Sequence, residues 1–364
     1  MKKNSDGRIQ TAEAGRGRAF VIRPSSFVIF LTCLALALPG PALAHEGPEH
    51  EIDELTERLQ AEGESADLLL QRAIEYNVMG KTAEAVKDLE RALTFESHSP
   101  IIQRELSRAY FAAGKTNEAY DTATRGIKYA AEGAERASLL MVRCDVLRAR
   151  KDYQKALDDA DQAIRQHPDN CEWYLARSQL QQQLGQKKER IKGLEDGLKE
   201  TGSGLLEGEW IDALIDGGKA EQALVKIEAE LEGARVQSTW LIRRARAFLA
   251  LKKKGQAQED LEAALTELND RLGRGATDPL LLMDRGQVHD LLGNREEAKK
   301  DYESARDKGV QDEWLRERLR VFKADEKKKD DKKKDGEKSK DDKAAAEEKK
   351  EEPKEDKPDG DEAK

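Results

Sequence analysis

A short motif recurs at nearly constant spacing through the middle of this 364-residue chain. The segment Gly80–Ala85 reads GKTAEA, and 34 residues later the segment Gly114–Ala119 reads GKTNEA. Continuing the same frame gives five further equivalents of Ala85 and Ala119, which are Ala156, Arg190, Ala223, Ala257 and Ala298. A period of this length is typical of solenoids, in which each repeat buries its apolar face only by stacking on its neighbours.

Small side chains occupy equivalent positions in most of these repeats. The position twelve residues before the recurring alanine holds Ala73, Ser107, Ala245 and Gly286, and the position seven residues after it holds Ala92, Ala163, Ala264 and Ala305. Small residues allow two helices to approach closely, because a large side chain would force their axes apart. Glycine stands five residues before the alanine in most repeats, at Gly80, Gly114, Gly218 and Gly293. A left-handed residue at that point ends one helix and turns into the next, so the frame predicts helix–turn–helix repeats.

These positions resemble those of the tetratricopeptide repeat (TPR) family. The resemblance is strongest over residues 66–99, 100–133 and 279–312, and it extends over about seven repeats within 66–312. It implies an all-α fold, a right-handed superhelical solenoid of TPR-like hairpins. Repeats four and five depart from the pattern, because Arg190 stands where alanine belongs and Ile211 stands where a small residue belongs. We therefore expect irregular packing in this part of the array.

The N-terminal residues have the pattern of a secretory signal peptide. Residues 1–44 contain six basic residues, then the apolar run Phe27–Leu38 and the small-residue sequence Ala42-Leu43-Ala44. The apolar run has about 12 residues, whereas a membrane-spanning helix needs about 20. We expect cleavage after Ala44 and a periplasmic or secreted protein, with an uncleaved anchor helix as the alternative.

The remaining segments flank the repeats. Both ends of a stacked array need polar covers, and residues 45–65 and 313–322 each contain a one-faced apolar pattern that predicts a capping helix. Residues 323–364 contain 15 Lys against 17 Asp and Glu, with no apolar residue larger than Ala and Pro. Such a segment buries too little apolar surface to offset the entropy of ordering, so we expect a disordered charged tail.

The composition favours binding over catalysis. Charged residues make up 38 % of the chain and its net charge is −9, which argues against a nucleic-acid partner because phosphate backbones need a basic surface. The sequence contains no H-E-x-x-H, no G-x-S-x-G and no phosphate-binding glycine loop. We therefore expect an exported, non-enzymatic protein–protein interaction scaffold with no cofactor and no membrane span in the mature chain.

The resemblance to the TPR family also implies where a partner peptide or domain docks. In that family the first helix of each repeat lines the concave face, and its inward positions here select Arg104, Arg108 and Phe111 in repeat two, Arg148 in repeat three and Arg246 in repeat six. Guanidinium groups bind carboxylates through two hydrogen bonds, so these arginines suit an acidic peptide. Ordinary solvated arginines are the alternative interpretation, because a chain this charged carries arginine on most of its surfaces.

A metal-binding or carrier function is the alternative to the scaffold. If the mature chain begins at His45, its free amine, the His45 imidazole and the nearby His50 would form a chelating group for copper or zinc. A polar N-terminal segment that holds no metal is the competing interpretation of the same residues.

Overall fold

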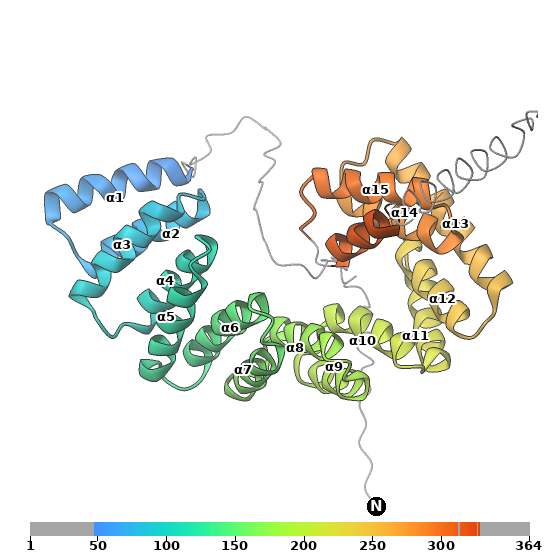
Figure 1. The fold of residues 1–364 in the computed structure, drawn as a ribbon, viewed down its shortest axis with the longest axis horizontal. Helices are drawn as coiled ribbons and strands as arrows, with labels where there is room; N and C mark the ends of the chain where they lie inside the picture. Colours follow the sequence, from blue (N-terminus) through green and yellow to red (C-terminus); the bar gives the residue numbers. More distant parts are fainter. Residues whose placement is uncertain (1–46, 312–313, 326, 328–364) are drawn as a thin grey trace, which may run out of the picture. The chain divides into compact units, whose positions relative to one another are not determined.

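The computed structural model describes residues 47–311, 314–325 and 327, and every regular element in this part of the chain is an α-helix (Figure 1). Helix α1 spans Pro48–Glu62 and precedes seven consecutive helix pairs. The pairs are α2 (Ala66–Val78) and α3 (Thr82–Phe95), α4 (Pro100–Ala112) and α5 (Thr116–Tyr129), α6 (Ala134–Ala149) and α7 (Tyr153–Gln166), α8 (Cys171–Gln183) and α9 (Lys187–Thr201), α10 (Gly204–Asp216) and α11 (Ala220–Gly233), α12 (Ser238–Ala250) and α13 (Lys254–Gly273), and α14 (Pro279–Leu292) and α15 (Arg295–Asp307). The predicted all-α repeat architecture is confirmed.

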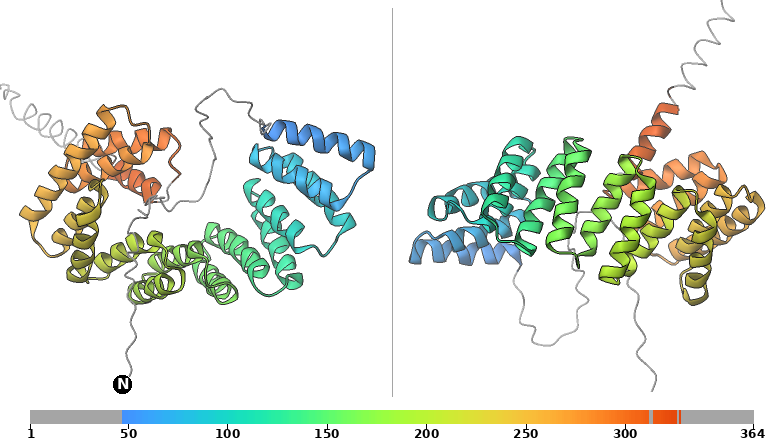
Figure 2. Two further views of the ribbon diagram at one scale, coloured as in Figure 1. Left: turned by 180° about the vertical axis from the view of Figure 1, so that it is seen from behind. Right: turned by 90° about the horizontal axis from the view of Figure 1, so that it is seen from below.

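The described residues divide into two compact blocks. The N-terminal block is 47–217, and the C-terminal block is the described part of 218–327. Within each block every helix packs on the next helix along the chain, and Figure 2 shows these neighbours lying side by side. The division falls between α10 and α11, the two helices that the repeat frame assigns to repeat five. Repeat five is therefore shared between two blocks, and this is where the small-residue pattern is broken by Ile211.

The recurring alanines lie where the two helices of a hairpin approach each other. Ala85, Ala119, Ala156, Ala223, Ala257 and Ala298 expose none of their surface, and neither do Ala73, Ala92, Ala163, Ala245, Ala264 and Ala305. Ser107 is equally buried, and its hydroxyl donates to the Ala119 carbonyl at 2.7 Å. A Cβ atom on Gly286 would come within 2.7 Å of the Tyr302 ring, so only glycine fits there without displacing the ring. Close helix approach therefore explains the small residues.

The turn between the two helices of a hairpin requires a left-handed backbone. Gly80, Gly114, Gly218 and Gly293 have φ values of 71°, 75°, 79° and 85°. In repeats three and six the same position holds Lys151 and Lys252, which adopt φ values of 64° and 61° despite their side chains. These two lysines store backbone strain that glycine avoids.

Repeat four replaces the buried alanine with an arginine that has its own set of partners. Arg190 is only 5 % exposed, and its guanidinium donates to Ser178 Oγ at 3.0 Å, to Glu209 Oε1 at 2.8 Å and to Asp216 Oδ2 at 3.0 Å. Glu209 and Asp216 lie on α10, so this buried polar cluster joins α9 to the following helix. Paired charges in the interior take the place of close alanine packing here.

Both ends of the repeat array are covered by a helix. Ile52 and Leu55 of α1 are buried at the N-terminal end. At the other end, residues 314–325 form a helix that extends three residues beyond the predicted boundary at 322, and Asp325 of this helix accepts a hydrogen bond from Arg295 at 2.7 Å. The predicted signal peptide (1–44) and nearly all of the predicted tail (323–364) lie outside the described residues.

Candidate partner-binding surface

The first helices of successive hairpins form one layer in the N-terminal block. Helix α2 contacts α4, α4 contacts α6 and α8 contacts α10, and a hydrogen bond from Arg148 to Gln179 links α6 to α8. In Figure 1 this layer lies on the inner side of the curve that the blue-to-green helices of this block describe. We call the solvent-facing side of α2, α4, α6 and α8 the inner face, and it is the surface on which the TPR resemblance placed a partner.

Two arginines lie one helical turn apart on α4, and one carboxylate holds both. Glu105 Oε1 accepts a hydrogen bond of 2.7 Å from Arg104 Nε and one of 3.4 Å from Arg108 Nη1. The Glu105 side chain is 11 % exposed and the Arg104 side chain 27 %, whereas that of Arg108 is 56 % exposed. Arg108 therefore keeps most of its donors directed to solvent, and Glu105 cancels only one of the two positive charges.

A third arginine, Arg148 on α6, bridges two helices. Its Nη1 donates to Gln179 Oε1 on α8 at 3.2 Å, and its Nη2 lies 3.2 Å from Asp145 Oδ1. Burial raises the pKa of the Asp145 carboxyl, and the positive charges of Arg148 and of Arg108 on the neighbouring helix oppose this effect. Three arginines of α4 and α6 thus share two carboxylates, which leaves one net positive charge on this part of an acidic protein.

Exposed aliphatic side chains occupy the helices at the N-terminal end of the same layer. Ile74 and Val78 on α2 are 38 % and 57 % exposed, and Ile101 at the start of α4 is 43 % exposed. Phe111, half-buried, lies in the last turn of α4. Apolar surface beside cationic side chains suits a partner segment that combines aliphatic and acidic residues.

The structure brings together four of the five residues selected for partner binding. Arg104, Arg108, Phe111 and Arg148 share α4 and α6, whereas Arg246 lies half-buried on α12 in the other block. Sequence reasoning missed Ile101 and Glu105. Ile101 occupies the second position of repeat two, which the family frame also marks as inward, so its signal was present in the sequence. The function of Glu105 depends on rotamers that place one oxygen between two guanidiniums, and no spacing encodes that.

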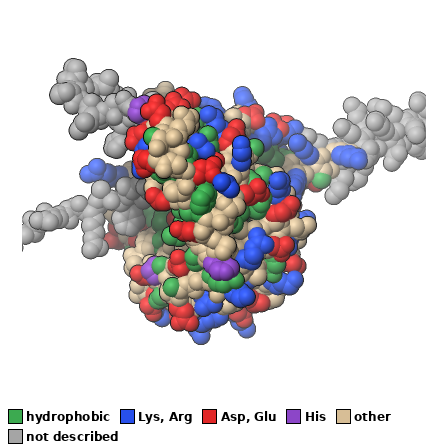
Figure 3. Space-filling model, turned by 90° about the vertical axis from the view of Figure 1, so that its left-hand side faces the viewer, with side chains coloured by type: hydrophobic (Ala, Val, Ile, Leu, Met, Phe, Trp, Pro, Cys, Tyr) green, Lys and Arg blue, Asp and Glu red, His purple; other side chains and the backbone are tan. Residues whose placement is uncertain are grey.

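The metal hypothesis depends on a residue outside the described part of the chain. His45 is not described, and His50 lies exposed in the first turn of α1. Among the described residues no three His, Cys, Asp or Glu side chains form a group that would hold a metal ion. In the same residues, no helix is at once long enough and apolar enough to cross a bilayer. Figure 3 views the end of the molecule formed by α1–α5, where acidic and basic side chains are interspersed with small apolar areas.

Comparison with known proteins identifies the fold. No protein-family model matches the sequence, and no curated protein matches it significantly. A tetratricopeptide repeat protein from Parabacteroides merdae has a similar structure, with a TM-score of 0.51 and 17 % identity over 75 % of this chain and 99 % of that one. The C-terminal part of a TPR repeat-containing protein from Cytophaga hutchinsonii gives a TM-score of 0.48 with 14 % identity over 68 % of this chain and 98 % of that one. The first likeness, together with the helix pairs described above, shows that this chain has a TPR fold.

Proposed function

We propose that this protein is an exported, non-enzymatic scaffold that docks an acidic and aliphatic segment of a partner protein on the inner face of α2, α4 and α6. The observation that carries the proposal is the exposed guanidinium of Arg108, which has a carboxylate on one side and exposed aliphatic residues on the adjoining helix. Docking of this kind involves no covalent step.

Pre-organisation supports this function. Glu105 and Asp145 orient the guanidiniums of Arg104 and Arg148 before any partner arrives, so less side-chain entropy is lost on binding. A partner carboxylate that approaches the more exposed Arg108 replaces solvent on its remaining donors. The exposed aliphatic side chains of Ile74, Val78 and Ile101 supply apolar area that binding would remove from water.

Export is the second part of the proposal, and it is supported by the order of basic residues, apolar run and Ala42-Leu43-Ala44 in residues 1–44. It is tested by expressing the full gene in a bacterial host and determining the N-terminal residue of the product by mass spectrometry. We expect a mature chain that begins at His45 and is recovered from the periplasm or the medium. An intact N-terminus in the cytoplasmic fraction would contradict export.

The inner face is tested by selecting peptides from a random library on the full chain and measuring their affinity by fluorescence polarisation. We expect the selected peptides to be rich in Asp, Glu and aliphatic residues. Arg104→Glu with Arg108→Glu should weaken binding by about ten-fold or more, since two charge-assisted contacts become repulsive. The control is Arg165→Glu with Lys192→Glu, which makes the same charge change at exposed positions of α7 and α9. Equal affinity of both variants, at unchanged helical content, would overturn the assignment.

A further inference from the structure

The last described helix, residues 314–325, has a fixed orientation on the C-terminal block. Leu315, Leu319 and Phe322 on one of its faces are 0 %, 5 % and 3 % exposed and pack with Tyr302 of α15. These three residues cover the end of the repeat array, whereas Trp314 and Val321 of the same helix remain 44 % and 37 % exposed.

Two arginine–aspartate contacts add to this apolar packing. Arg318 Nη2 donates to Asp290 Oδ1 of α14 at 2.6 Å, and Arg295 Nη2 of α15 donates to Asp325 Oδ2 at 2.7 Å. The guanidiniums of Arg318 and Arg295 lie 5.2 Å and 4.7 Å from the centre of the Phe322 ring. Because these contacts fix the rotation of the helix about its axis, they also fix which residues it presents to solvent.

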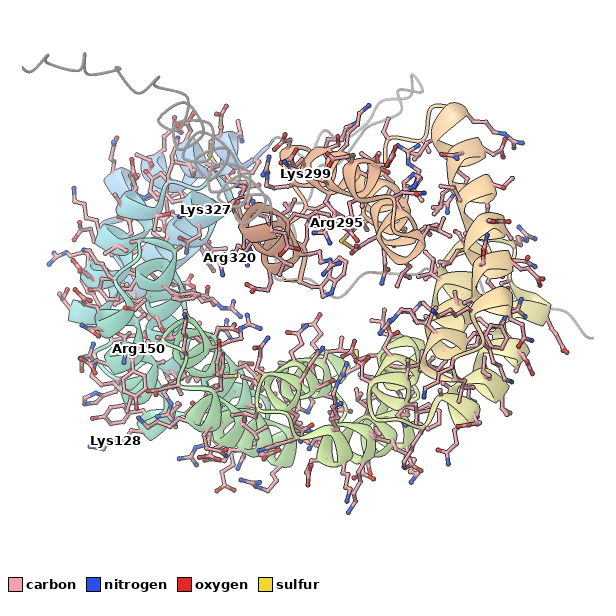
Figure 4. The ribbon with its side chains drawn as sticks, turned by 45° about the vertical axis from the view of Figure 1, so that its right-hand side comes forward. Lys128, Arg150, Arg295, Lys299, Arg320 and Lys327 are labelled. Carbon is pink, nitrogen blue, oxygen red and sulfur yellow. The ribbon has the colours of Figure 1, made fainter. Side chains whose placement is uncertain are left out.

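A stripe of cations runs along the exposed side of this helix. Arg316, Arg320 and Lys323 lie on this helix, and Lys327, just beyond its described end, is also helical; all four are exposed, and they are spaced four, three and four residues apart. In a helix this spacing places them within about 60° of arc and over about 16 Å of length. We call these four residues the basic stripe. Figure 4 labels Arg320 and Lys327 of the stripe, together with Arg295 and Lys299 of α15.

The positive charge of the basic stripe is largely uncompensated. Arg320 lies 3.1 Å from Glu317, and both side chains are well exposed, so this pair is weak. Within the described residues no ion pair is formed by Arg316, Lys323 or Lys327. The sequence continues the charge, since residues 316–334 contain ten Lys and Arg against five Asp and Glu. This concentration is unusual in a chain whose net charge is −9.

We propose that the basic stripe docks the protein on the surface of an anionic phospholipid bilayer. A straight, rigid row of cations can approach a plane of phosphate groups along its whole length, and each Lys or Arg near such a surface adds to the attraction. The stripe itself contains no apolar residue, and the exposed Trp314 and Val321 lie about 100° or more away from it round the helix axis, so the contact is electrostatic, without insertion, and sensitive to salt. Export, proposed from residues 1–44, would place the chain among bilayers rather than nucleic acids. This inference does not depend on the inner face.

The residues after the stripe provide an opposing charge. Residues 335–364 contain thirteen Asp and Glu against eight Lys. This negative charge is joined to the basic stripe by a short segment. It is repelled by an anionic surface, and it also competes with that surface for the cations of the stripe. We therefore expect residues 335–364 to weaken docking, and their removal to strengthen it.

The test is co-sedimentation of the full chain with vesicles. One set contains about 30 % phosphatidylglycerol in phosphatidylcholine, and the other contains phosphatidylcholine alone, both at about 50 mM salt, where surface electrostatics are weakly screened. We expect the protein to pellet with the anionic vesicles only, and the pelleted fraction to fall about five-fold in salt of about 300 mM. A chain that ends at Lys334 should bind about three-fold more tightly than the full chain.

Substitutions then assign the binding to the stripe. Replacing Arg316, Arg320, Lys323 and Lys327 by Gln should lower binding to anionic vesicles about ten-fold or more, while the matched control Lys87→Gln, Lys187→Gln, Lys188→Gln and Lys192→Gln should bind as the parent does. Arg316→Lys with Arg320→Lys preserves the charge and should preserve binding. Undiminished binding of the stripe variant, or equal binding to neutral vesicles, would overturn the proposal. So would stripe-dependent binding to duplex DNA that is tighter than binding to the vesicles.

Discussion

Arg143 on α6 holds Asp159 on α7 through two hydrogen bonds, of 2.8 Å from Nε to Oδ2 and 2.7 Å from Nη2 to Oδ1. The two residues are sixteen positions apart, and their side chains are 18 % and 3 % exposed. Three other hairpins contain the same two-bond pair at the same separation, namely Arg72 with Asp88, Arg244 with Asp260 and Arg285 with Asp301. The planar fork of arginine fits a carboxylate in one orientation, so each pair fixes the two helices of its hairpin in register.

Three of these four arginines also reach back to the preceding helix. The Nη1 atom of Arg72 donates to Thr56 Oγ1 at 3.0 Å, that of Arg143 to Thr124 Oγ1 at 3.3 Å, and that of Arg285 to Asn269 Oδ1 at 2.9 Å. Each of these side chains therefore ties together three helices. The sequence contains this pattern. An arginine recurs thirteen residues before the recurring alanine of these hairpins, and an aspartate recurs three residues after it.

We predict that Asp159→Ala lowers the free energy of unfolding by about 3 kcal/mol, because it leaves the largely buried Arg143 without its carboxylate. The measurement is urea unfolding of the full chain followed by circular dichroism. Repeat two supplies the control, since Leu106 and Thr122 stand at the two equivalent positions. The double variant Arg143→Leu with Asp159→Thr should lie within about 1 kcal/mol of the parent, because no charge is left unpaired. If Asp159→Ala proves as stable as the double variant, the pair does not hold the hairpin.

The sequence predicts the repeat architecture because close helix packing restricts which residues fit, and that restriction recurs every 34 residues or so. Ala85 and Ala257 are equivalent in sequence for the same reason that both are fully buried. The two charged partners of Arg190 were not predictable in this way. They are Glu209 and Asp216, which lie 19 and 26 residues further along the chain, and no periodic pattern links them. The division of repeat five between the two blocks was not predictable either, because it depends on which neighbouring helices α10 and α11 pack against.

The arginines of the inner face illustrate a second limit. The family frame assigns Arg104 and Arg108 to one side of the first helix of repeat two, and both lie on α4 one helical turn apart, because helical periodicity alone fixes their relative direction. Whether they are available to a partner depends on the neighbouring carboxylates. Glu105 engages both of them, yet leaves Arg108 more than half exposed, and this follows from side-chain geometry rather than from residue type.

Two glycines in helices should respond oppositely to alanine. Gly286→Ala places a Cβ atom 2.7 Å from the Tyr302 ring, and because that ring is fully buried we expect a loss of about 1–3 kcal/mol. Gly255 lies in the first turn of α13, and a Cβ atom added there would have no heavy atom within 4 Å, so Gly255→Ala should gain about 0.5–1 kcal/mol by lowering the entropy of the unfolded chain. Thermal unfolding of both variants distinguishes the two effects. A Gly286→Ala protein as stable as the parent would show that the α14–α15 contact is looser than described.

Replacing a strained lysine by glycine should stabilise the protein. Lys252 lies between α12 and α13 with φ of 61°, a conformation that costs a residue with a side chain about 1 kcal/mol or more. Lys252→Gly removes that strain at the expense of a more flexible unfolded chain, so we expect a net gain of about 0.5 kcal/mol. Lys253→Gly is the control, because Lys253 has φ of −89° and should lose stability instead. The two variants are compared by chemical denaturation, and a stability order opposite to this one would contradict the strain.

The stability of the C-terminal block should depend on pH through Asp284. Burial raises the pKa of this carboxyl to about 6, with Asp278 adding to the effect and Arg243 and Arg271 opposing it. The unfolded chain titrates near 4, so between about pH 4 and 6 the folded state binds more protons than the unfolded state. Stability is therefore lost as the pH rises through this window, and the full cost of the buried charge is present above pH 6.

Asp284→Asn should remove that cost. We expect the variant to be more stable than the parent by on the order of 1 kcal/mol at pH 7 and equally stable near pH 3, where the parent carboxyl is largely neutral in both states. The measurement is thermal unfolding of both proteins at intervals between pH 3 and 7. Asp278→Asn on the same helix is the comparison, because Asp278 accepts a hydrogen bond from the Leu280 N–H at 2.9 Å as the N-cap of α14. Its charge is favourable at that helix terminus, so this variant should gain nothing at pH 7. A stability difference between Asp284→Asn and parent that stays constant over the whole range would show that Asp284 is already ionised at low pH in the folded protein.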